Sequence, residues 1–273
     1  MVMNSVNTNV AAQIALQFLN QTTRDLDQAQ NRVSTGLRVS SAVDDASSFA
    51  IAQGIRGDLK AYSAVTQGLA NGKGLATIAL AASNSISDLL GDIQAKIVQG
   101  MNAANTTAQQ AILNADFQSL TAQINTFISN AVFNGRNLLS SASNSVNVIA
   151  NIDGTTLTLR SQSAFSISSA ALGAQALSTT QGAFQALSAL ALAEAAVNVV
   201  LGQIGADTRT LNFQDNFISQ LTDATNVGLG SIVDADMARE SARLQALQVK
   251  QQLGVQTLNI ANQRPNILQQ LFK

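Results

Sequence analysis

The chain has 273 residues with 15 Lys plus Arg against 16 Asp plus Glu, and it contains no His, Cys or Trp. These absences exclude disulfides, thiol nucleophiles, Cys or His metal sites and Ser-His-Asp catalysis. Charged residues make up 11% of the chain where about 25% is usual, so association with other proteins is the first expectation for so thinly charged a surface.

The net charge and the hydropathy argue against two classes of partner. A net charge of -1 provides no basic face for phosphates, so we expect no nucleic-acid binding. The most apolar window, residues 183–201, is interrupted by Gln185, Glu194 and Asn198, so we expect no membrane contact. Residues 1–23 contain no Lys or Arg, which argues against a cleavable secretory signal.

The N-terminal segment shows apolar residues at helical spacing. They are Val6, Val10, Ile14, Phe18, Leu19, Leu26 and Val33. Residues 1–40 are therefore predicted to form a helix with an extended apolar surface. Asp44 and Asp45 follow two serines, and we interpret them as a helix N-cap and a first-turn acid rather than as catalytic carboxylates.

The next hundred residues continue the helical pattern. Apolar residues recur in steps of three and four across residues 52–69, 86–97 and 113–131. Gly72-Lys73-Gly74 is not a phosphate-binding loop, which needs Gly where Gln67 stands and Ser or Thr at position 74, and we interpret it as a flexible helix joint. Asn105-Thr106-Thr107 is predicted to cap the helix that follows.

The middle of the chain lacks the helical spacing of the segments before it. Alternating residues surround an Asp-Gly pair in residues 146–159, which predicts a β-hairpin flanked by loops within residues 141–180. A coiled-coil-like ladder then runs over residues 187–218.

The C-terminal segment has two apolar stripes at helical spacing. The first is Met237, Leu244, Leu247 and Leu258; the second is Val249, Leu253, Ile260 and Ile267, with Leu268 and Leu271 near the end. We predict a capping box at residues 231–234, after the breaker Gly228-Leu229-Gly230, and helix-start acids at Asp234 and Asp236.

These elements predict a mainly α fold, a long coiled-coil-like helical bundle with a small β-hairpin module in the middle of the chain. Two apolar stripes on one helix imply two buried faces. Both ends of the chain carry such surfaces, so we expect them to pack between molecules and to stay loosely ordered until partners cover them.

Several segments carry a resemblance to bacterial flagellin. They are NSVNTN at 4–9, RVSTGLRVSSAVDDA at 32–46, FNGRNLL at 133–139, DADMARE at 234–240, and QQLG at 251–254 followed by IANQ at 260–263. The signature positions among them are Arg32, Gly36, Asp44, Asp45, Asn134, Gly135 and Asn262. The chain is most similar to compact alphaproteobacterial flagellins.

The resemblance implies an architecture and a role. Residues 1–40 and 231–273 would form filament-core helices, residues 41–140 and 181–230 a rod-like helical domain, and residues 141–180 a short variable module facing solvent. The protein would be a secreted structural subunit of the extracellular flagellar filament, exported unfolded through the flagellar type III channel.

The resemblance also implies partners. These are further copies of the chain, the flagellar cap and hook-associated proteins, and an export chaperone. No enzymatic activity, cofactor or metal is expected. Two alternatives stay open: a hook-filament junction protein with similar terminal helices, and a secreted helical protein that inserts residues 183–201 in a membrane.

Overall fold

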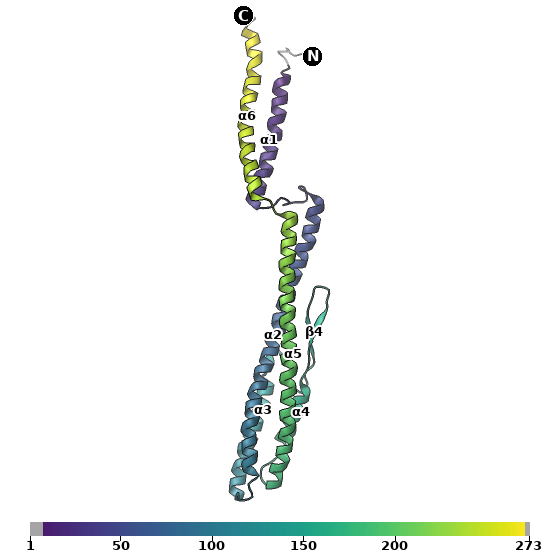
Figure 1. Ribbon diagram of the computed structural model, residues 1–273, viewed down its shortest axis with the longest axis vertical. Coiled ribbons are helices and arrows are strands. Elements are labelled where there is room, and N and C mark those ends of the chain that lie inside the picture. The colour runs from purple at the N-terminus through teal and green to yellow at the C-terminus, as the bar shows by residue number, and fades with distance from the viewer. Residues whose placement is uncertain (1–7, 271–273) are drawn as a thin grey trace. The chain divides into compact units, whose positions relative to one another are not determined.

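The computed structural model describes residues 8–270, without the side chains of residues 164, 167 and 264–270. The described chain divides into two compact units (Figure 1). Unit 1 comprises residues 1–57 and 224–273, and unit 2 comprises residues 58–223. The predicted fold class is confirmed, because long helices dominate and a small strand module lies in the middle of the chain.

The elements follow one another in a simple order. They are α1 (Val10–Thr35), α2 (Ala46–Gly100), α3 (Thr107–Asn130), β1 (Val132–Phe133), β2 (Arg136–Asn137), β3 (Val146–Ile149), β4 (Thr156–Leu159), α4 (Ser163–Gly173), α5 (Thr180–Val233) and α6 (Met237–Gln270). Pro265 is the single proline of the sequence, so α2 and α5 run for 55 and 54 residues without meeting a helix breaker of that kind.

Unit 2 is a helical bundle built around α2 and α5. The two helices are antiparallel, because Lys73 pairs with Asp215 at 3.1 Å while Gly100 lies against Ala183. Every seventh residue of α5 is buried from Leu190 to Ile218: Leu190, Val197, Ile204, Leu211 and Ile218. This heptad seam is the predicted ladder, and each fully buried Leu or Ile contributes about 1.5–3 kcal/mol.

Two shorter helices complete the bundle. Thr106 caps α3 as predicted, in a capping box with Gln109. Phe117 of α3 and Phe165 of α4 are fully buried in the shared core. The helix α4 departs from the loops predicted for residues 163–173, because serines crowd the segment and Phe165 and Leu172 are the large apolar side chains that its described residues bury, beside Ser169.

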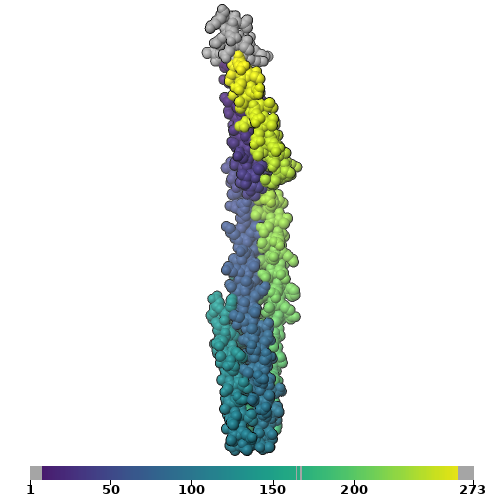
Figure 2. Space-filling view, turned by 90° about the vertical axis from the view of Figure 1, so that its left-hand side faces the viewer, coloured from purple at the N-terminus to yellow at the C-terminus, as the bar shows by residue number. Residues whose placement is uncertain are grey.

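The predicted hairpin is present in unit 2. β3 pairs antiparallel with β4, with Val146 opposite Leu159 and Ile149 opposite Thr156, and Gly154 has a φ of 81° in the turn. The hairpin lies along α2, where teal atoms cover part of the blue helix in Figure 2. The hairpin is also bound to α5 through Gln214, whose amide donates to the Ala150 carbonyl oxygen at 2.7 Å.

The predicted flexible joint at Gly72-Lys73-Gly74 is wrong. The three residues lie inside α2, and the glycines serve packing instead. A Cβ at position 72 would lie 2.7 Å from Val148 Cγ2, and one at position 74 would lie 2.8 Å from Phe133 Cζ. The two glycines therefore form a notch in α2 that receives side chains of β3 and β1.

Candidate assembly surface

Unit 1 pairs the two ends of the chain as antiparallel helices. Asn9 caps α1 by accepting from the Ala12 backbone N–H at 3.1 Å, which satisfies one of the free donors of the first turn. Its amide nitrogen donates to the carbonyl oxygen of Ala261 in α6 at 2.8 Å. One side chain thus starts α1 and attaches it to the late part of α6.

The other end of the helix pair is held by an ion pair. Arg32 Nη1 lies 3.1 Å from Glu240 Oε1, and their side chains are 20% and 10% exposed. Arg32 Nε and Glu240 Oε2 are buried without a hydrogen-bond partner among the described residues. The contact is therefore single rather than bidentate, so the cost of removing both charges from water is only partly offset.

Between these two ends the helices meet through small side chains. Ala15 and Ala29 of α1 and Ala261 of α6 are buried, together with Leu247. A Cβ at position 254 would lie 3.2 Å from Leu19 Cδ1, so Gly254 lets α1 approach closely. The remaining predicted residues of this seam are half-buried: Leu19, Leu26, Val33, Leu244 and Leu258.

A second apolar surface faces away from the seam. In α1 it is a ridge of residues four apart, and in α6 it is the second predicted stripe. Its predicted members are Val10, Ile14 and Phe18 of α1 and Val249, Leu253 and Ile260 of α6, all exposed in unit 1; Met237 of the first stripe is also exposed, on another face of α6. Phe18 is 66% and Leu253 60% exposed. Exposed apolar surfaces of this extent mark sites of association.

Leu16 and Val255 are exposed too, on other faces of α1 and α6, and are not among the residues predicted from the sequence. Each stands three residues before a half-buried residue of the seam, Leu19 or Leu258, so spacing alone does not distinguish it from the seam. Val6 and Leu271 lie outside the described residues, as do the side chains of Ile267 and Leu268. Asn262 is exposed on α6.

The signature loop between α1 and α2 is organised by two aspartates. Asp45 is the N-cap of α2, with Oδ1 accepting from the Ser47 and Ser48 backbone N–H groups at 3.0 and 3.1 Å. The Ser48 hydroxyl donates to Asp45 Oδ2 and is the largest cause of the lowered pKa of Asp45. The expected cap is thus present at Asp45, and hydrogen bonds in the loop favour its charged form. The expected first-turn acid is wrong, because no acidic residue lies in the first turn of α2.

Asp44 holds the loop that precedes this cap. Its Oδ2 accepts from the hydroxyl and the backbone N–H of Ser40 at 2.9 and 3.1 Å, and from the Ser41 N–H at 3.0 Å. The hydrogen bonds from Ser40 are the main cause of the lowered pKa of Asp44. Both aspartates are therefore occupied by local structure rather than placed for acid-base chemistry.

The loop is joined to the junction of α5 and α6. Gly36 ends α1 with a φ of 72°, a conformation that favours glycine, and its carbonyl oxygen accepts from the Ala235 N–H at 2.9 Å. Arg38 N–H and Val39 N–H both donate to the Val233 carbonyl oxygen. The signature glycine therefore lets the end of α1 meet the start of α6.

The predicted capping box at residues 231–234 is wrong, and so is the breaker before it. α5 continues through Gly228 and Gly230 to Val233, because the last turn is fixed by the buried Val233 and by the loop that donates to its carbonyl oxygen. Asp236 is the cap of α6 instead, accepting from the Ala238 and Arg239 backbone N–H groups at 3.1 Å each.

The remaining signature pair lies in unit 2. Asn134 and Gly135 connect β1 to β2 with φ values of 47° and 75°; a two-residue type I′ hairpin turn requires positive φ at both positions. The turn places Phe133 over the notch at Gly74. Its role is thus to direct the chain from α3 back along the bundle.

Among residues 8–270 no group of three or more His, Cys, Asp or Glu is placed to hold a metal ion. α5 is long and apolar enough to cross a membrane by length and composition alone. Its heptad residues Leu190, Val197 and Ile204 are buried in the bundle of unit 2, which accounts for the apolar residues on one face of the helix.

Comparison with known proteins identifies the two halves of the chain separately. The bacterial flagellin N-terminal helical region matches residues 6–144, and the bacterial flagellin C-terminal helical region matches residues 187–272. Flagellin FljM of Caulobacter vibrioides is 37% identical over 276 residues, covering all of both chains. A flagellin of Brucella melitensis is 37% identical over 283 residues, covering 99% of this chain and 100% of that one.

Solved structures agree at the level of the fold. Bacillus cereus flagellin superimposes with a TM-score of 0.50 at 19% identity, covering 55% of this chain and 88% of that one. A putative flagellar hook-associated protein from Vibrio parahaemolyticus gives 0.57 at 15% identity, covering 70% of this chain and 100% of that one. From the family regions and the full-length relatives together, the chain belongs to the bacterial flagellin family and is a structural subunit of the flagellar filament, not an enzyme.

Proposed function

We propose that this flagellin polymerises mainly through the exposed apolar surface of unit 1, the residues of α1 and α6 that face away from the α1–α6 seam. The observation that carries the proposal is the second apolar stripe of α6, which stays exposed although the first stripe is already used against α1. Covering Leu253 and Ile260 in a neighbour would contribute about 1.5–3 kcal/mol for each side chain.

The geometry of such an interface accounts for a filament. A contact between the exposed residues of α1 and α6 and a different surface of the neighbouring subunit would be heterologous. Repeated heterologous contacts whose rotation does not close generate an open helical polymer. The remaining predicted members, Val6, Ile267, Leu268 and Leu271, extend the same surface in sequence.

The domain assignment is part of the proposal. Residues 1–40 and 231–273 form the filament core, residues 41–140 and 181–230 the outer helical domain, and residues 141–180 the solvent-facing module. The last assignment is supported by the turn of the hairpin, where residues 153–156 are all exposed.

Further partners follow from the terminal location of the apolar surface. The flagellar cap, the hook-associated proteins and an export chaperone would each meet the same exposed residues of α1 and α6 at different stages. Export of the chain without a cleavable signal, through the flagellar type III channel, belongs to this proposal as well.

Seeded elongation tests the proposal with the full chain. We compare Leu253→Ser/Ile260→Ser with Gln248→Ser, which changes an exposed polar residue outside the stripe. The double variant is expected to raise the subunit concentration needed for elongation at least about tenfold, since 1.4 kcal/mol corresponds to a factor of ten. Gln248→Ser should elongate like the wild type.

Two outcomes would contradict the proposal. Elongation of the double variant at the wild-type concentration would show that the exposed apolar surface of unit 1 is not the main interface. Binding of one wild-type subunit layer to the seeds without further growth would instead support a junction protein. Circular dichroism of each variant checks that the helices of unit 2 are intact.

A further inference from the structure

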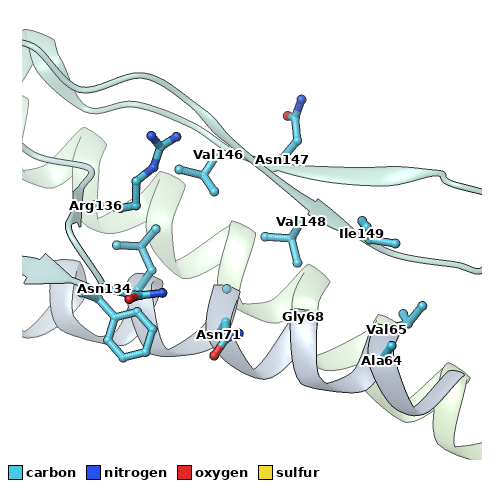
Figure 3. A pocket seen from close by; sticks show the side chains of 13 residues that line it. Ala64, Val65, Gly68, Asn71, Asn134, Arg136, Val146, Asn147, Val148 and Ile149 are labelled. Atoms are coloured by element: carbon cyan, nitrogen blue, oxygen red, sulfur yellow. The ribbon is translucent and has the colours of Figure 1, made fainter. Parts of the chain in front are cut away.

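Unit 2 contains an apolar hollow between α2 and the β3–β4 hairpin. Its volume is about 370 Å³, and it opens to the surface (Figure 3). Ala64, Val65 and Gly68 line it from α2, while Val146 and Val148 line it from β3. The side chains of Asn71, Asn134, Asn147 and Arg136 lie around it.

The hollow exists because α2 changes from close to distant packing within one turn. At Gly72 the helix touches Val148, which would lie 2.7 Å from a Cβ there. At Gly68 a Cβ would meet nothing within 4 Å. Since no described side chain fills the space at Gly68, an apolar group from outside the chain could be buried there.

A row of large apolar side chains lies exposed on another surface of unit 2. It consists of Phe184, Leu192, Val199, Phe213 and Phe217 of α5. At 100° per residue these positions fall within roughly one quarter of the helix circumference and extend for about 50 Å. Phe213 is 73% exposed, so this row has no cover within the chain.

One exposed charge, Arg209, stands four residues before Phe213 on the face of α5 that carries the row, and the other charges between Phe184 and Phe217 are directed elsewhere. Asp207 is paired with Arg160 at 2.9 Å and Asp215 with Lys73 at 3.1 Å, and both pairs lie within unit 2. Glu194 is half-buried. The face of α5 that carries the row therefore offers apolar groups with few charges to desolvate, which favours association.

We infer that the hollow receives an apolar side chain from the α5 row of a second copy of this chain. The inference rests on the chain's role as a filament subunit, which brings copies together at high local concentration. Among the described residues, no residue of α5 lines the hollow, so the row and the hollow are separate surfaces of the chain. The contact joins two different surfaces, as an open polymer requires.

The chemistry of the two surfaces fits one insertion per contact. A volume of about 370 Å³ is more than sufficient for one leucine or phenylalanine side chain, since a cavity of about 150 Å³ already holds a benzene ring. Arg136 beside the hollow can stack on an aromatic ring, which favours a phenylalanine of the row. This contact adds a second interface, in unit 2, to the surface proposed for unit 1.

Cysteine cross-linking tests the contact directly, because the native chain has no Cys. Asn147→Cys, at the exposed edge of the hollow, is mixed in equal amounts with Phe184→Cys, Val199→Cys or Phe217→Cys, and each mixture is polymerised and oxidised. Ile112→Cys on α3 is the control, exposed but outside the row. We expect disulfide-linked dimers with at least one row variant, about tenfold above the control mixture and above each variant alone.

A second variant tests the hollow without cysteine. Gly68→Phe fills it, while Gly91→Phe adds the same side chain elsewhere on α2, where a Cβ also meets nothing within 4 Å. Gly68→Phe should raise the concentration needed for seeded elongation about tenfold, and Gly91→Phe should change it less than about twofold.

The outcomes separate this inference from the proposed function. Wild-type chains that fail to elongate seeds overturn the filament assembly itself. If filaments form normally but Asn147→Cys cross-links to no row variant above the control, the inference alone is overturned. The same holds if Gly68→Phe and Gly91→Phe change the concentration needed for seeded elongation equally.

Discussion

Asn9 and Ala261 are 252 residues apart in sequence, and the Asn9 amide donates to the Ala261 carbonyl oxygen at 2.8 Å. The same side chain caps α1 through the Ala12 N–H. Because both bonds use one residue, the start of α1 forms together with its attachment to α6. The ends of this chain are thus coupled at the point where its exposed apolar surface begins.

Two substitutions of Asn9 separate the two bonds. Asn9→Asp keeps the oxygen that accepts from Ala12 but cannot donate to Ala261, so it should cost filaments about 1 kcal/mol per subunit. Asn9→Ala also removes the cap and should cost about 1 kcal/mol more. Heat dissociation of filaments measures both, and equal effects would show that the bond to Ala261 carries the whole contribution.

The Arg32–Glu240 pair predicts a different pattern. Arg32→Met leaves the Glu240 side chain, 10% exposed, without its partner, and Glu240→Leu does the same to Arg32, 20% exposed. Each single substitution should destabilise the helix pair by about 2–3 kcal/mol. The double variant should recover most of that loss, because the single contact leaves Arg32 Nε and Glu240 Oε2 without partners.

A double-mutant cycle on filament dissociation measures this coupling. Additive losses in the double variant would contradict it, because independent side chains show no recovery. High salt provides a control, since screening weakens exposed ion pairs far more than one that is largely buried.

The notch in α2 predicts an unusual response to alanine. Gly→Ala within a helix normally stabilises by about 0.5–1 kcal/mol, and Gly91→Ala should do so because a Cβ there meets nothing within 4 Å. Gly72→Ala should instead destabilise unit 2 by about 1–3 kcal/mol, since its Cβ would overlap Val148. Urea unfolding measures both variants.

Val148 provides the check on that mechanism. In a Val148→Ala background the obstruction is gone, so Gly72→Ala should become neutral or stabilising. If Gly72→Ala destabilises equally in both backgrounds, the cause lies in the backbone of α2 rather than in the hairpin contact.

The same notch shows where sequence reasoning succeeds and where it fails. The heptad from Leu190 to Ile218 could be predicted because burial on one helix face imposes a period that the sequence displays. Gly72 and Gly228 mislead because local propensity makes glycine a breaker, whereas both lie inside long helices held by tertiary contacts. Nothing local to Gly72 indicates that Val148, far along the chain, needs the space.

The surface could be predicted only in part for a related reason. Two stripes on α6 indicated two buried faces, but spacing alone does not say which one α1 occupies. The structure assigns Leu247 to the seam and leaves Leu253 exposed, because Gly254 and the small residues of α1 select the closer approach. The helix α4 escaped prediction because its serines compete for backbone hydrogen bonds and hide a short apolar spacing.

The signature loop predicts a pH dependence with a defined sign. Hydrogen bonds from Ser40 lower the pKa of Asp44, and those from Ser48 lower the pKa of Asp45, from the ordinary value of 3.8. The unfolded loop therefore binds protons more readily than the folded one. The stabilisation is complete above the ordinary value and is lost as the pH falls through the lowered pKa values of the two carboxyls.

NMR of the full chain between about pH 6 and about pH 2, a range spanning the ordinary aspartate pKa, follows this loss at the backbone amides of Ser47 and Ser48. Their shifts should stay constant above the ordinary value and move toward unfolded positions only below it. Asp45→Asn keeps an oxygen that can cap α2 but has no proton to gain, so the change at Ser47 should disappear while the one at Ser40, which reports Asp44, remains. A shift at Ser47 that persists in Asp45→Asn would assign the acid sensitivity to the loop around Asp44, and the start of α2 would then depend on Ser40 more than on its own cap.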